Sequence, residues 1–234
     1  MSAEHEMNVV ARIHSDFATK FGIPRQSGLI EALKAKVVFE PEYRNAEALR
    51  GIEGFSHIWL IWQFSAAVRQ EWSPTVRPPR LGGNVRMGVF ATRSPFRPNP
   101  IGLSSVRLER VEWDTPQGPV LHVAGADLMD GTPIYDIKPY VPYADCHPNA
   151  LGGFAPQAPA LLQVDFPESL LQKVPAHHRA ALREVLANDP RPAYQRDPKR
   201  IYGFSFAGME VRFSVQDTVL KVQAVEPAAP SPAK

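Results

Sequence analysis

Short apolar runs, several of them alternating with polar positions, punctuate the amino-terminal half of the chain. Alternation with a period of two, bounded by Gly and Pro, is typical of strands that bury one face. The lengths of the runs and their turn residues favour an antiparallel barrel or sandwich over alternating β and α units. We predict strands at 8–13, 34–40, 56–64, 85–93, 101–113 and 119–128, and one short helix at 43–50.

The pattern changes in the second half of the chain. Residues 147–160 are rich in Gly, Pro and Ala, as linkers are. Apolar residues then recur at helical spacing over 175–189, and 201–227 resembles two or three strands. We therefore expect a mainly β protein with a compact antiparallel β-barrel domain at 5–146, a smaller α+β domain at 161–226 and a disordered tail at 227–234.

Composition excludes several classes of protein. Of the 234 residues, 44% are apolar, which is enough for a sizeable core. A single cysteine, Cys146, rules out an intramolecular disulfide and fits a reducing cytosol. No apolar run approaches the ~18 residues of a membrane span. The chain has neither GxGxxG nor a P-loop, and no His pairs with Cys or Glu at metal-ligand spacing, so we expect neither a Rossmann nucleotide site nor a metal site.

Charge is distributed unevenly, although the net charge is only +2. Residues 69–110 contain eight arginines and two acids, whereas 111–190 contain ten acids and four Lys or Arg. Such asymmetry favours a localised basic surface that meets an anionic partner. The alternative is a mixed surface on which like charges happen to cluster.

The stretch GVFATRSPFRPNPIGLS (88–104) carries the densest candidate chemistry. Its three prolines fix φ and remove backbone donors, so Arg93, Arg97 and Asn99 are expected on a stiff, extended loop. Stiffness lowers the entropy cost of holding long side chains for binding, and arginine offers a bidentate fork to phosphate or carboxylate. The segment is therefore either an anion or nucleotide site or a rigid turn with solvated arginines.

The stretch DLMDGTPIYDIKPY (127–140) gathers three aspartates within ten residues. Asp130 precedes a glycine, which is a turn signal, so these acids are expected at a loop next to a strand end. Asp136 and Lys138 would share one face of an extended segment. Carboxylates here could accept hydrogen bonds from a ribose, an amine or a ring N–H, or they could be turn residues with a surface ion pair.

The stretch FGIPRQSG (21–28) is another proline-stiffened loop. It carries Arg25, which can stack or bind an anion, and Gln26, which can pair with a base edge. Alone, this signal is weak.

Together these segments resemble one known family. PRQSGL (24–29), RGIEGFSHIWLI (50–61), PPRLGGNVRMGVFATRSPFRPNPIGLS (78–104) and DLMDGTPIYDIKPY (127–140) are similar to the TsaA-like, or TrmO, family. The resemblance covers residues 5–145, and DPRPAYQ (189–195) resembles the smaller carboxy-terminal domain of bacterial members. It implies an S-adenosylmethionine-dependent tRNA methyltransferase with a β-barrel fold, which agrees with the missing GxGxxG.

The resemblance also implies a substrate and a site. The methyl group would go to N6 of the threonylcarbamoyladenosine at position 37, just 3′ of the anticodon, in a cytoplasmic homodimer whose sites form where two subunits meet. Asn99 and Asp136 are candidates to take up the N6 proton, Lys138 to orient Asp136, and Arg97 to bind the threonyl carboxylate. The cofactor pocket would comprise Arg25, Gln26, Ser27, Ser65, Arg93, Leu103, Ala124, Gly125, Ala126 and Asp127.

Two other functions stay open from the residues alone. The chain could be a non-catalytic RNA-binding module that keeps the basic loop, in which case it would bind tRNA but not the cofactor. It could also methylate a different small substrate with the same barrel.

Overall fold

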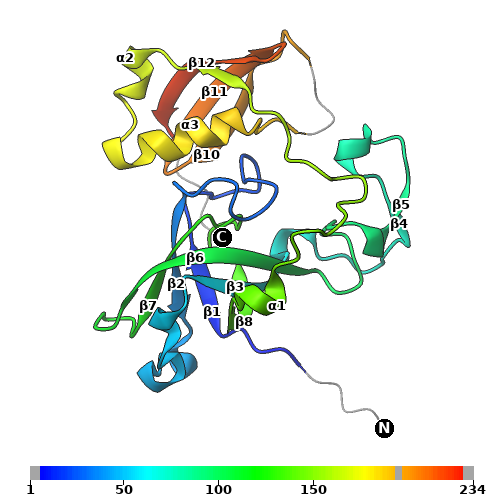
Figure 1. The fold of residues 1–234 in the computed structure, drawn as a ribbon. Coiled ribbons are helices and arrows are strands. Elements are labelled where there is room, and N and C mark those ends of the chain that lie inside the picture. The colour runs from blue at the N-terminus through cyan, green and yellow to red at the C-terminus, as the bar shows by residue number, and fades with distance from the viewer. Residues whose placement is uncertain (1–5, 193–196, 229–234) are drawn as a thin grey trace.

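The structure, a computed structural model, describes residues 6–192 and 197–228. Six strands close into an antiparallel barrel, in the order β1-β2-β7-β6-β3-β8. A four-stranded sheet with short helices lies above the barrel in Figure 1. The expected fold class, a β-barrel with a smaller α+β part, is confirmed. The barrel strands are β1 (Ala11–His14), β2 (Lys34–Phe39), β3 (His57–Gln63), β6 (Ile101–Glu112), β7 (Val120–Ala124) and β8 (Pro133–Pro139).

Strand β3 illustrates how the sequence pattern builds the barrel. Ile58, Leu60 and Trp62 are buried in the barrel core, and the residues between them are only partly buried. Neighbouring strands β6 and β8 pair with β3 on either side, so its backbone groups are satisfied while one face remains apolar. Leu103 on β6 and Asp136 on β8 are both paired with Ile61 of this strand.

A lobe formed by residues 64–100 separates β3 from β6 and projects to the right in Figure 1. The predicted strand 85–93 is wrong. Only Met87–Gly88 (β5) pairs, with Thr75–Val76 (β4), and Val89–Ala91 turns into a 3-10 helix. A strand needs a partner of matching length, and here the ladder ends after two residues.

The predicted helix at 43–50 is also wrong in detail. The chain instead forms two 3-10 turns, Pro41–Tyr43 and Ala46–Leu49. The Asn45 side chain between them accepts a hydrogen bond of 3.0 Å from the backbone N–H of Glu47, so a new turn starts there. Short polar side chains that bond the local backbone favour such breaks.

The carboxy-terminal domain packs helix α3 against a mostly antiparallel sheet. Its elements are β9 (Gln163–Asp165), α2 (Glu168–Leu171), α3 (Arg179–Ala187), β10 (Tyr202–Phe206), β11 (Met209–Gln216) and β12 (Val219–Pro227). The sheet order is β10-β11-β12-β9, with β9 parallel to β12. The predicted helix is thus confirmed over α3, and the strands predicted within 201–227 number three, β10 to β12.

The segment between β1 and β2 belongs to the core of the carboxy-terminal domain. Phe17, Ile30 and Leu33 are buried in one cluster with the side chains of α3 and β10–β12. The rings of Phe17 and Phe206 lie 5.5 Å apart, edge to face. The backbone N–H of Ala207 donates to the carbonyl of Asp16 across 2.8 Å. Residues 15–33 therefore join the two domains physically, although the chain itself crosses between them much later.

Residues 146–162 cross between the domains without strand or α-helix, after the short helix α1 (Pro142–Asp145). Arg80 of the lobe donates to the backbone carbonyl of Gln157, which ties this linker to the lobe. Of the tail expected at 227–234, Pro227 ends β12, and 229–234 lie outside the described residues. No helix in 6–192 or 197–228 is long and apolar enough to cross a membrane.

Candidate active site

A largely buried loop carboxylate, Asp127, is the centre of the first group of site residues. The hydroxyl of Ser104, on the buried face of β6, donates to Oδ1 of Asp127 across 2.6 Å. Nε1–H of Trp62, on β3, donates in turn to Ser104 Oγ across 2.9 Å. The backbone N–H of Ser27 is a further hydrogen-bond donor to the Asp127 carboxylate. Three segments far apart in the sequence thus hold one carboxyl group.

The environment of Asp127 changes its acidity. Burial disfavours the charged form and raises the pKa of Asp127 above the usual range of an aspartate. The hydrogen bond from Ser104, the positive charge of Arg93 and the Ser27 N–H all act in the opposite direction, but burial outweighs them. A carboxylate with a perturbed pKa beside a cation and a loop is typical of a functional site.

Glycines allow these close approaches. A Cβ atom on Gly102 would lie 2.3 Å from the Trp62 ring, so only glycine lets the indole lie where it reaches Ser104. Gly125, with φ of +79°, places its carbonyl 2.9 Å from the backbone N–H of Gly28. These contacts dock the 24–28 loop against the segment Ala124–Asp127, which the family resemblance assigns to the cofactor pocket.

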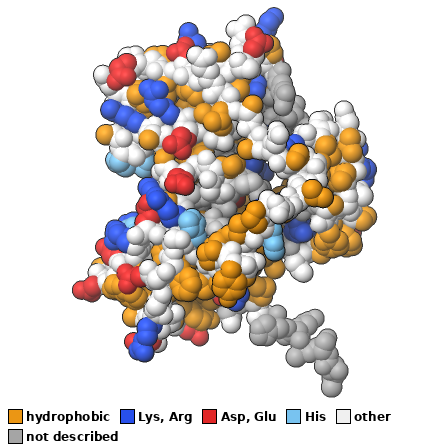
Figure 2. All heavy atoms as spheres, viewed as in Figure 1, with side chains coloured by type: hydrophobic (Ala, Val, Ile, Leu, Met, Phe, Trp, Pro, Cys, Tyr) orange, Lys and Arg blue, Asp and Glu red, His pale blue; other side chains and the backbone are white. Residues whose placement is uncertain are grey.

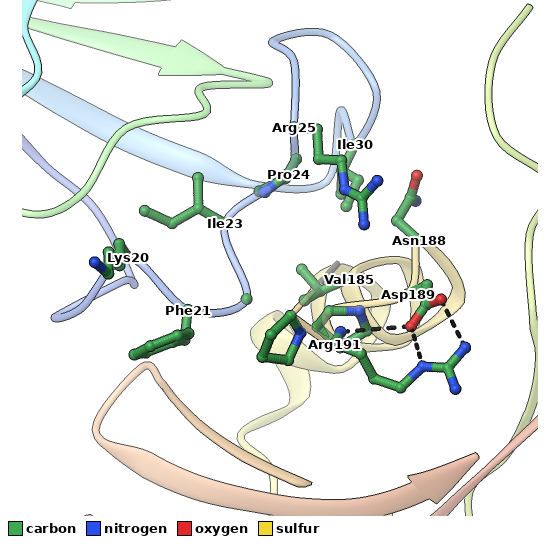
Figure 3. Close-up of a pocket in the computed structure, with 13 residues that line it drawn as sticks. Lys20, Phe21, Ile23, Pro24, Arg25, Ile30, Val185, Asn188, Asp189 and Arg191 are labelled. Atoms are coloured by element: carbon green, nitrogen blue, oxygen red, sulfur yellow. Dashed lines mark hydrogen bonds and ion pairs between the residues drawn. The ribbon is translucent and has the colours of Figure 1, made fainter. Parts of the chain in front are cut away.

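The 24–28 loop meets the lobe through two side chains. Arg93 donates a hydrogen bond to Oε1 of Gln26, and Nε2 of Gln26 donates to the backbone carbonyl of Arg25. The Arg25 side chain extends from the same loop toward Asn188 and Asp189 of the carboxy-terminal domain (Figure 3). The structure therefore brings together Arg25, Gln26, Ser27, Arg93, Ala124, Gly125, Ala126 and Asp127.

A second group lies on the outer face of the barrel. Ile61 of β3 pairs with Leu103 on one side and with Asp136 on the other, so these three residues form a row across three strands. Leu103 is 57% exposed, which confirms that the row faces outward. Nζ of Lys138 lies 2.9 Å from Oδ2 of Asp136, and Oδ1 accepts a hydrogen bond of 2.9 Å from the Ile137 N–H. The structure thus contains the ion pair between Lys138 and Asp136, whereas its role in the reaction stays a prediction.

Three further predicted residues lie on loops at the ends of β3 and β6. Arg97 is half-buried, and its Nη1 donates to the carbonyls of Thr92 and Ser94 across 3.0 and 3.4 Å. Its guanidinium therefore braces its own loop, although five N–H groups leave capacity for a ligand. Asn99 is exposed, two residues before β6. Ser65 is exposed in the turn that follows β3, next to Phe64, whose N–H donates to the Pro100 carbonyl.

Sequence reasoning missed Ser104 and Trp62. Both face the barrel interior. In a sequence, a serine or a tryptophan at such a position cannot be distinguished from a residue that only fills the core. The available signal was the spacing of Gly102 and Ser104, a glycine and a hydroxyl at successive interior positions of one strand. Among the residues that the structure describes, no group of three or more His, Cys, Asp or Glu side chains is arranged to hold a metal ion.

Family models match both domains. Residues 12–146 match the tRNA-methyltransferase O N-terminal domain, and 159–228 match the TrmO C-terminal domain. The matched ranges contain every site residue named above.

Individual relatives agree with these matches. The tRNA (adenine(37)-N6)-methyltransferase of Escherichia coli is 43% identical over 224 residues, covering 92% of this chain and 95% of the relative. A Pyrococcus abyssi protein named "Probable S-adenosyl-L-methionine-binding protein" is 41% identical over 143 residues, covering 61% of this chain and 71% of the relative. A crystal structure of TrmO from Pseudomonas aeruginosa superposes with a TM-score of 0.76 at 32% identity, covering 96% of this chain and 99% of that one. The chain belongs to the tRNA-methyltransferase O family.

Proposed function

We propose that this protein is an S-adenosylmethionine-dependent tRNA methyltransferase that methylates N6 of the threonylcarbamoyladenosine at position 37. The observation that carries the proposal is the convergence of the 24–28 loop, Arg93 and the segment Ala124–Asp127 around one carboxylate. Membership of the family and the likeness to the E. coli enzyme support the reaction.

The first group of residues fits an adenosine-containing cofactor. A carboxylate has about four acceptor positions, and Ser104, the Ser27 N–H and the backbone N–H of Asp127 itself account for three of those at Asp127. The remaining position suits a ribose hydroxyl, and the close backbones of the Gly28 and Gly125 segments suit a flat base. When bound, S-adenosylmethionine supplies an electrophilic methyl group on a sulfonium centre. Arg25, Gln26, Ser27, Ser65, Arg93, Leu103 and Ala124–Asp127 would hold it.

The second group suits the methyl acceptor. N6 of adenine is a poor nucleophile because its lone pair is delocalised into the ring and into the carbamoyl group. A carboxylate that takes up the N6 proton, as N6 bonds to the methyl group and the bond from that methyl to sulfur breaks, would offset this weakness. Asp136 is our candidate acceptor of that proton, with Asn99 as a second hydrogen-bond acceptor. Lys138, 2.9 Å from Asp136, would hold the carboxylate oriented.

Arg97 suits the negative charge of the substrate. The threonyl group of the modified adenosine ends in a carboxylate, which a guanidinium can bind with two parallel hydrogen bonds. Because Nη1 of Arg97 is anchored to the Thr92 and Ser94 carbonyls, the side chain is already ordered. An ordered cation binds at a lower entropy cost than a free one.

The lobe is our candidate surface for tRNA. Between Phe64 and Pro100 it holds six of the arginines and a single acid, Glu71. Neutralising phosphates with arginine makes binding strongly dependent on salt. An anticodon loop also offers unstacked bases that a pocket can read. A protein that acts on tRNA is expected in the cytoplasm.

We also propose that the protein works as a homodimer. Val68, Trp72 and Phe90 of the lobe are 58%, 53% and 73% exposed, and the rings of Trp72 and Phe90 lie 6.2 Å apart. Figure 2 shows hydrophobic side chains gathered on this lobe, on the right of the view. Neighbouring exposed apolar side chains often mark an interface, and a second copy that covers them would approach the Arg93 and Arg97 loop.

A methyl-transfer assay tests the function. The purified protein is incubated with S-adenosylmethionine labelled in the methyl group and with tRNA that carries or lacks the threonylcarbamoyl group. We expect label in N6 of adenosine 37 only when that group is present. Label on free nucleoside or protein would contradict the substrate, and salt-sensitive tRNA binding without cofactor binding would favour a non-catalytic RNA-binding module.

A further inference from the structure

The 24–28 loop is held from below by the barrel and from above by the carboxy-terminal domain. Gly22, with φ of +84°, lies so close to Phe204 of β10 that a Cβ atom would stand 2.3 Å from its ring. Ile30, on the other side of the loop, is 1% exposed within the same core. The two flanks of the loop are therefore fixed by packing against the carboxy-terminal domain, which leaves its tip to be positioned by polar contacts.

The end of helix α3 faces this loop with an unusual residue. The helix ends at Ala187, and Asp189 adopts φ of +53° in the left-handed region. This position after a helix is most often glycine, because glycine takes the left-handed conformation without steric cost. A non-glycine residue in this conformation is strained, so an aspartate here indicates that its carboxylate has a structural or functional role.

The carboxylate of Asp189 is held in place by a bidentate ion pair. Nε and Nη2 of Arg191 donate to its two oxygens across 2.7 and 2.8 Å, and the Arg191 side chain is 10% exposed. Burial acts against ionisation of Asp189, but the hydrogen bonds and charge of Arg191, together with the charge of Arg25, outweigh it and lower the pKa of Asp189. Asp189 is therefore an ordered, charged group at neutral pH.

A cavity of about 130 Å³ separates Asp189 from the 24–28 loop. Its wall is formed by Lys20–Arg25 and Ile30 on one side and by the end of α3 and Asn188–Pro192 on the other. Figure 3 shows the Arg25 guanidinium reaching from its loop across the cavity toward Asn188 and Asp189. The positive charge of Arg25 therefore faces the ordered carboxylate of the other domain.

Contacts continue from Arg25 to the carboxylate at the proposed cofactor site. The backbone carbonyl of Arg25 accepts the Gln26 amide, Gln26 accepts Arg93, and Arg93 acts electrostatically on Asp127. We propose that Asp189, braced by Arg191, is a positioning residue through which the carboxy-terminal domain holds Arg25 and with it the cofactor-binding loop. The role in cofactor binding rests on the proposed function, whereas the role in ordering the loop does not.

The test compares Asp189→Asn with a matched control. Asparagine also tolerates the left-handed region, so this substitution removes the charge and spares the backbone. Asp217→Asn is the control, because Asp217 has the same φ of +53° but is exposed in the turn between β11 and β12. We expect hydrogen exchange at residues 24–28 to accelerate, and the Kd for S-adenosylmethionine to rise about tenfold, only in Asp189→Asn.

A double-mutant cycle separates positioning from simple destabilisation. If Asp189 acts through Arg25, adding Asp189→Asn to Arg25→Ala changes neither the exchange at 24–28 nor the Kd further. Additive effects, or the same change in Asp217→Asn, would overturn the proposal. Should Asp189→Asn fail to fold, Arg25→Ala alone tests the proposal, because Arg25 is exposed and its replacement leaves the core intact. The proposal requires faster hydrogen exchange at 24–28 in Arg25→Ala, and unchanged exchange would refute it.

Loss of the proposed function gives a different result. A wild-type protein that binds no S-adenosylmethionine would contradict the methyltransferase assignment. Faster exchange at 24–28 in Asp189→Asn would still support the ordering of the loop by the carboxy-terminal domain. Unchanged exchange with normal cofactor binding would reject the positioning role and leave the enzyme assignment intact.

Discussion

Ser104 donates a 2.6 Å hydrogen bond to Asp127, so a hydroxyl inside the barrel fixes a carboxylate in the loop that follows β7. The same oxygen accepts the Trp62 indole N–H. Ser104 therefore links the barrel core to the proposed cofactor site, and removing its hydroxyl affects both.

The first prediction concerns Ser104→Ala. The change leaves the buried Trp62 N–H and one oxygen of Asp127 without this partner, and hydrogen bonds to charged groups contribute about 1.5–3 kcal/mol. We expect the free energy of unfolding to fall by about 2 kcal/mol in denaturant titrations, with weaker S-adenosylmethionine binding. Ser105→Ala, on the outer face of the same strand, is the control and should change neither. Equal losses in both variants would contradict the role of Ser104.

The second prediction is a pH dependence from Asp127. Its pKa in the folded protein is raised by burial above the value of about 3.9 expected when unfolded. The folded state thus binds more protons between these two values, and the contribution of Asp127 to stability decreases as pH rises through them. The charged form is the one that would accept hydrogen bonds from a ribose. We expect S-adenosylmethionine binding, followed by calorimetry, to weaken on acidification through the raised pKa, and Asp127→Asn to bind weakly with a flat profile.

The barrel could be predicted because its strands carry their own signal. In β3, residues 58–62 form a short continuous apolar run bounded by polar residues, which indicates a strand without any partner, and the structure then buries every second residue of His57–Gln63. The segment 85–93 does not form the predicted strand, for the converse reason. Whether an apolar run becomes a strand depends on a partner strand, and β4 supplies only two residues. That information is not local to the run.

The grouping of the candidate site residues could be predicted only where they lie in motifs that resemble the family, and their roles stay predictions. The 24–28 loop, Arg93 and Asp127 are polar residues on Pro- or Gly-marked loops, and the structure brings them together. The spacing of Gly102 and Ser104 marks an interior position but does not show the contact with Trp62, because that contact depends on the register of β6 against β3. The approach of Arg25 to Asp189 depends on how the two domains pack. The pattern of apolar and polar residues along the chain carries no information on that packing.

The third prediction concerns the proposed proton acceptor, Asp136. Replacing it with Asn keeps a hydrogen-bond acceptor but removes the basic oxygen and the ion pair with Lys138. General-base assistance contributes about 10²–10⁴-fold, so kcat should fall by roughly this factor while the Kd for S-adenosylmethionine stays near wild type. Single-turnover assays separate the two quantities. Asp114→Asn, at an exposed position between β6 and β7, is the control, and a wild-type rate in Asp136→Asn would exclude Asp136 as the base.

The fourth prediction concerns recognition of the threonyl carboxylate. Arg97→Lys keeps the charge but loses the planar fork that bonds the Thr92 carbonyl and could bind a carboxylate with two donors. Affinity for tRNA with the threonylcarbamoyl group should fall about tenfold, while affinity for tRNA without it stays within about twofold. Arg86→Gln, on the lobe, should lower the affinity for both tRNAs alike. It should also reduce the slope of log affinity against log salt concentration by the amount expected for about one phosphate contact. Equal losses for both tRNAs in Arg97→Lys would assign Arg97 to general phosphate binding.

The fifth prediction concerns the proposed homodimer. Phe90 is 73% exposed beside Trp72, so a charge at this position would have to be desolvated if a second copy covers the lobe. In sedimentation velocity, Phe90→Glu should therefore shift the protein from dimer to monomer while its melting temperature stays that of a folded chain. Leu151→Glu is the matched control, because Leu151 is an equally apolar residue, 98% exposed, in the linker between the domains, and should remain dimeric. A dimer that survives Phe90→Glu, or that dissociates equally in Leu151→Glu, would place the contact between subunits elsewhere.

If the second copy completes the site, the monomeric Phe90→Glu variant should also lose methyl transfer at protein concentrations where Leu151→Glu retains it. At those concentrations the variant no longer assembles the interface.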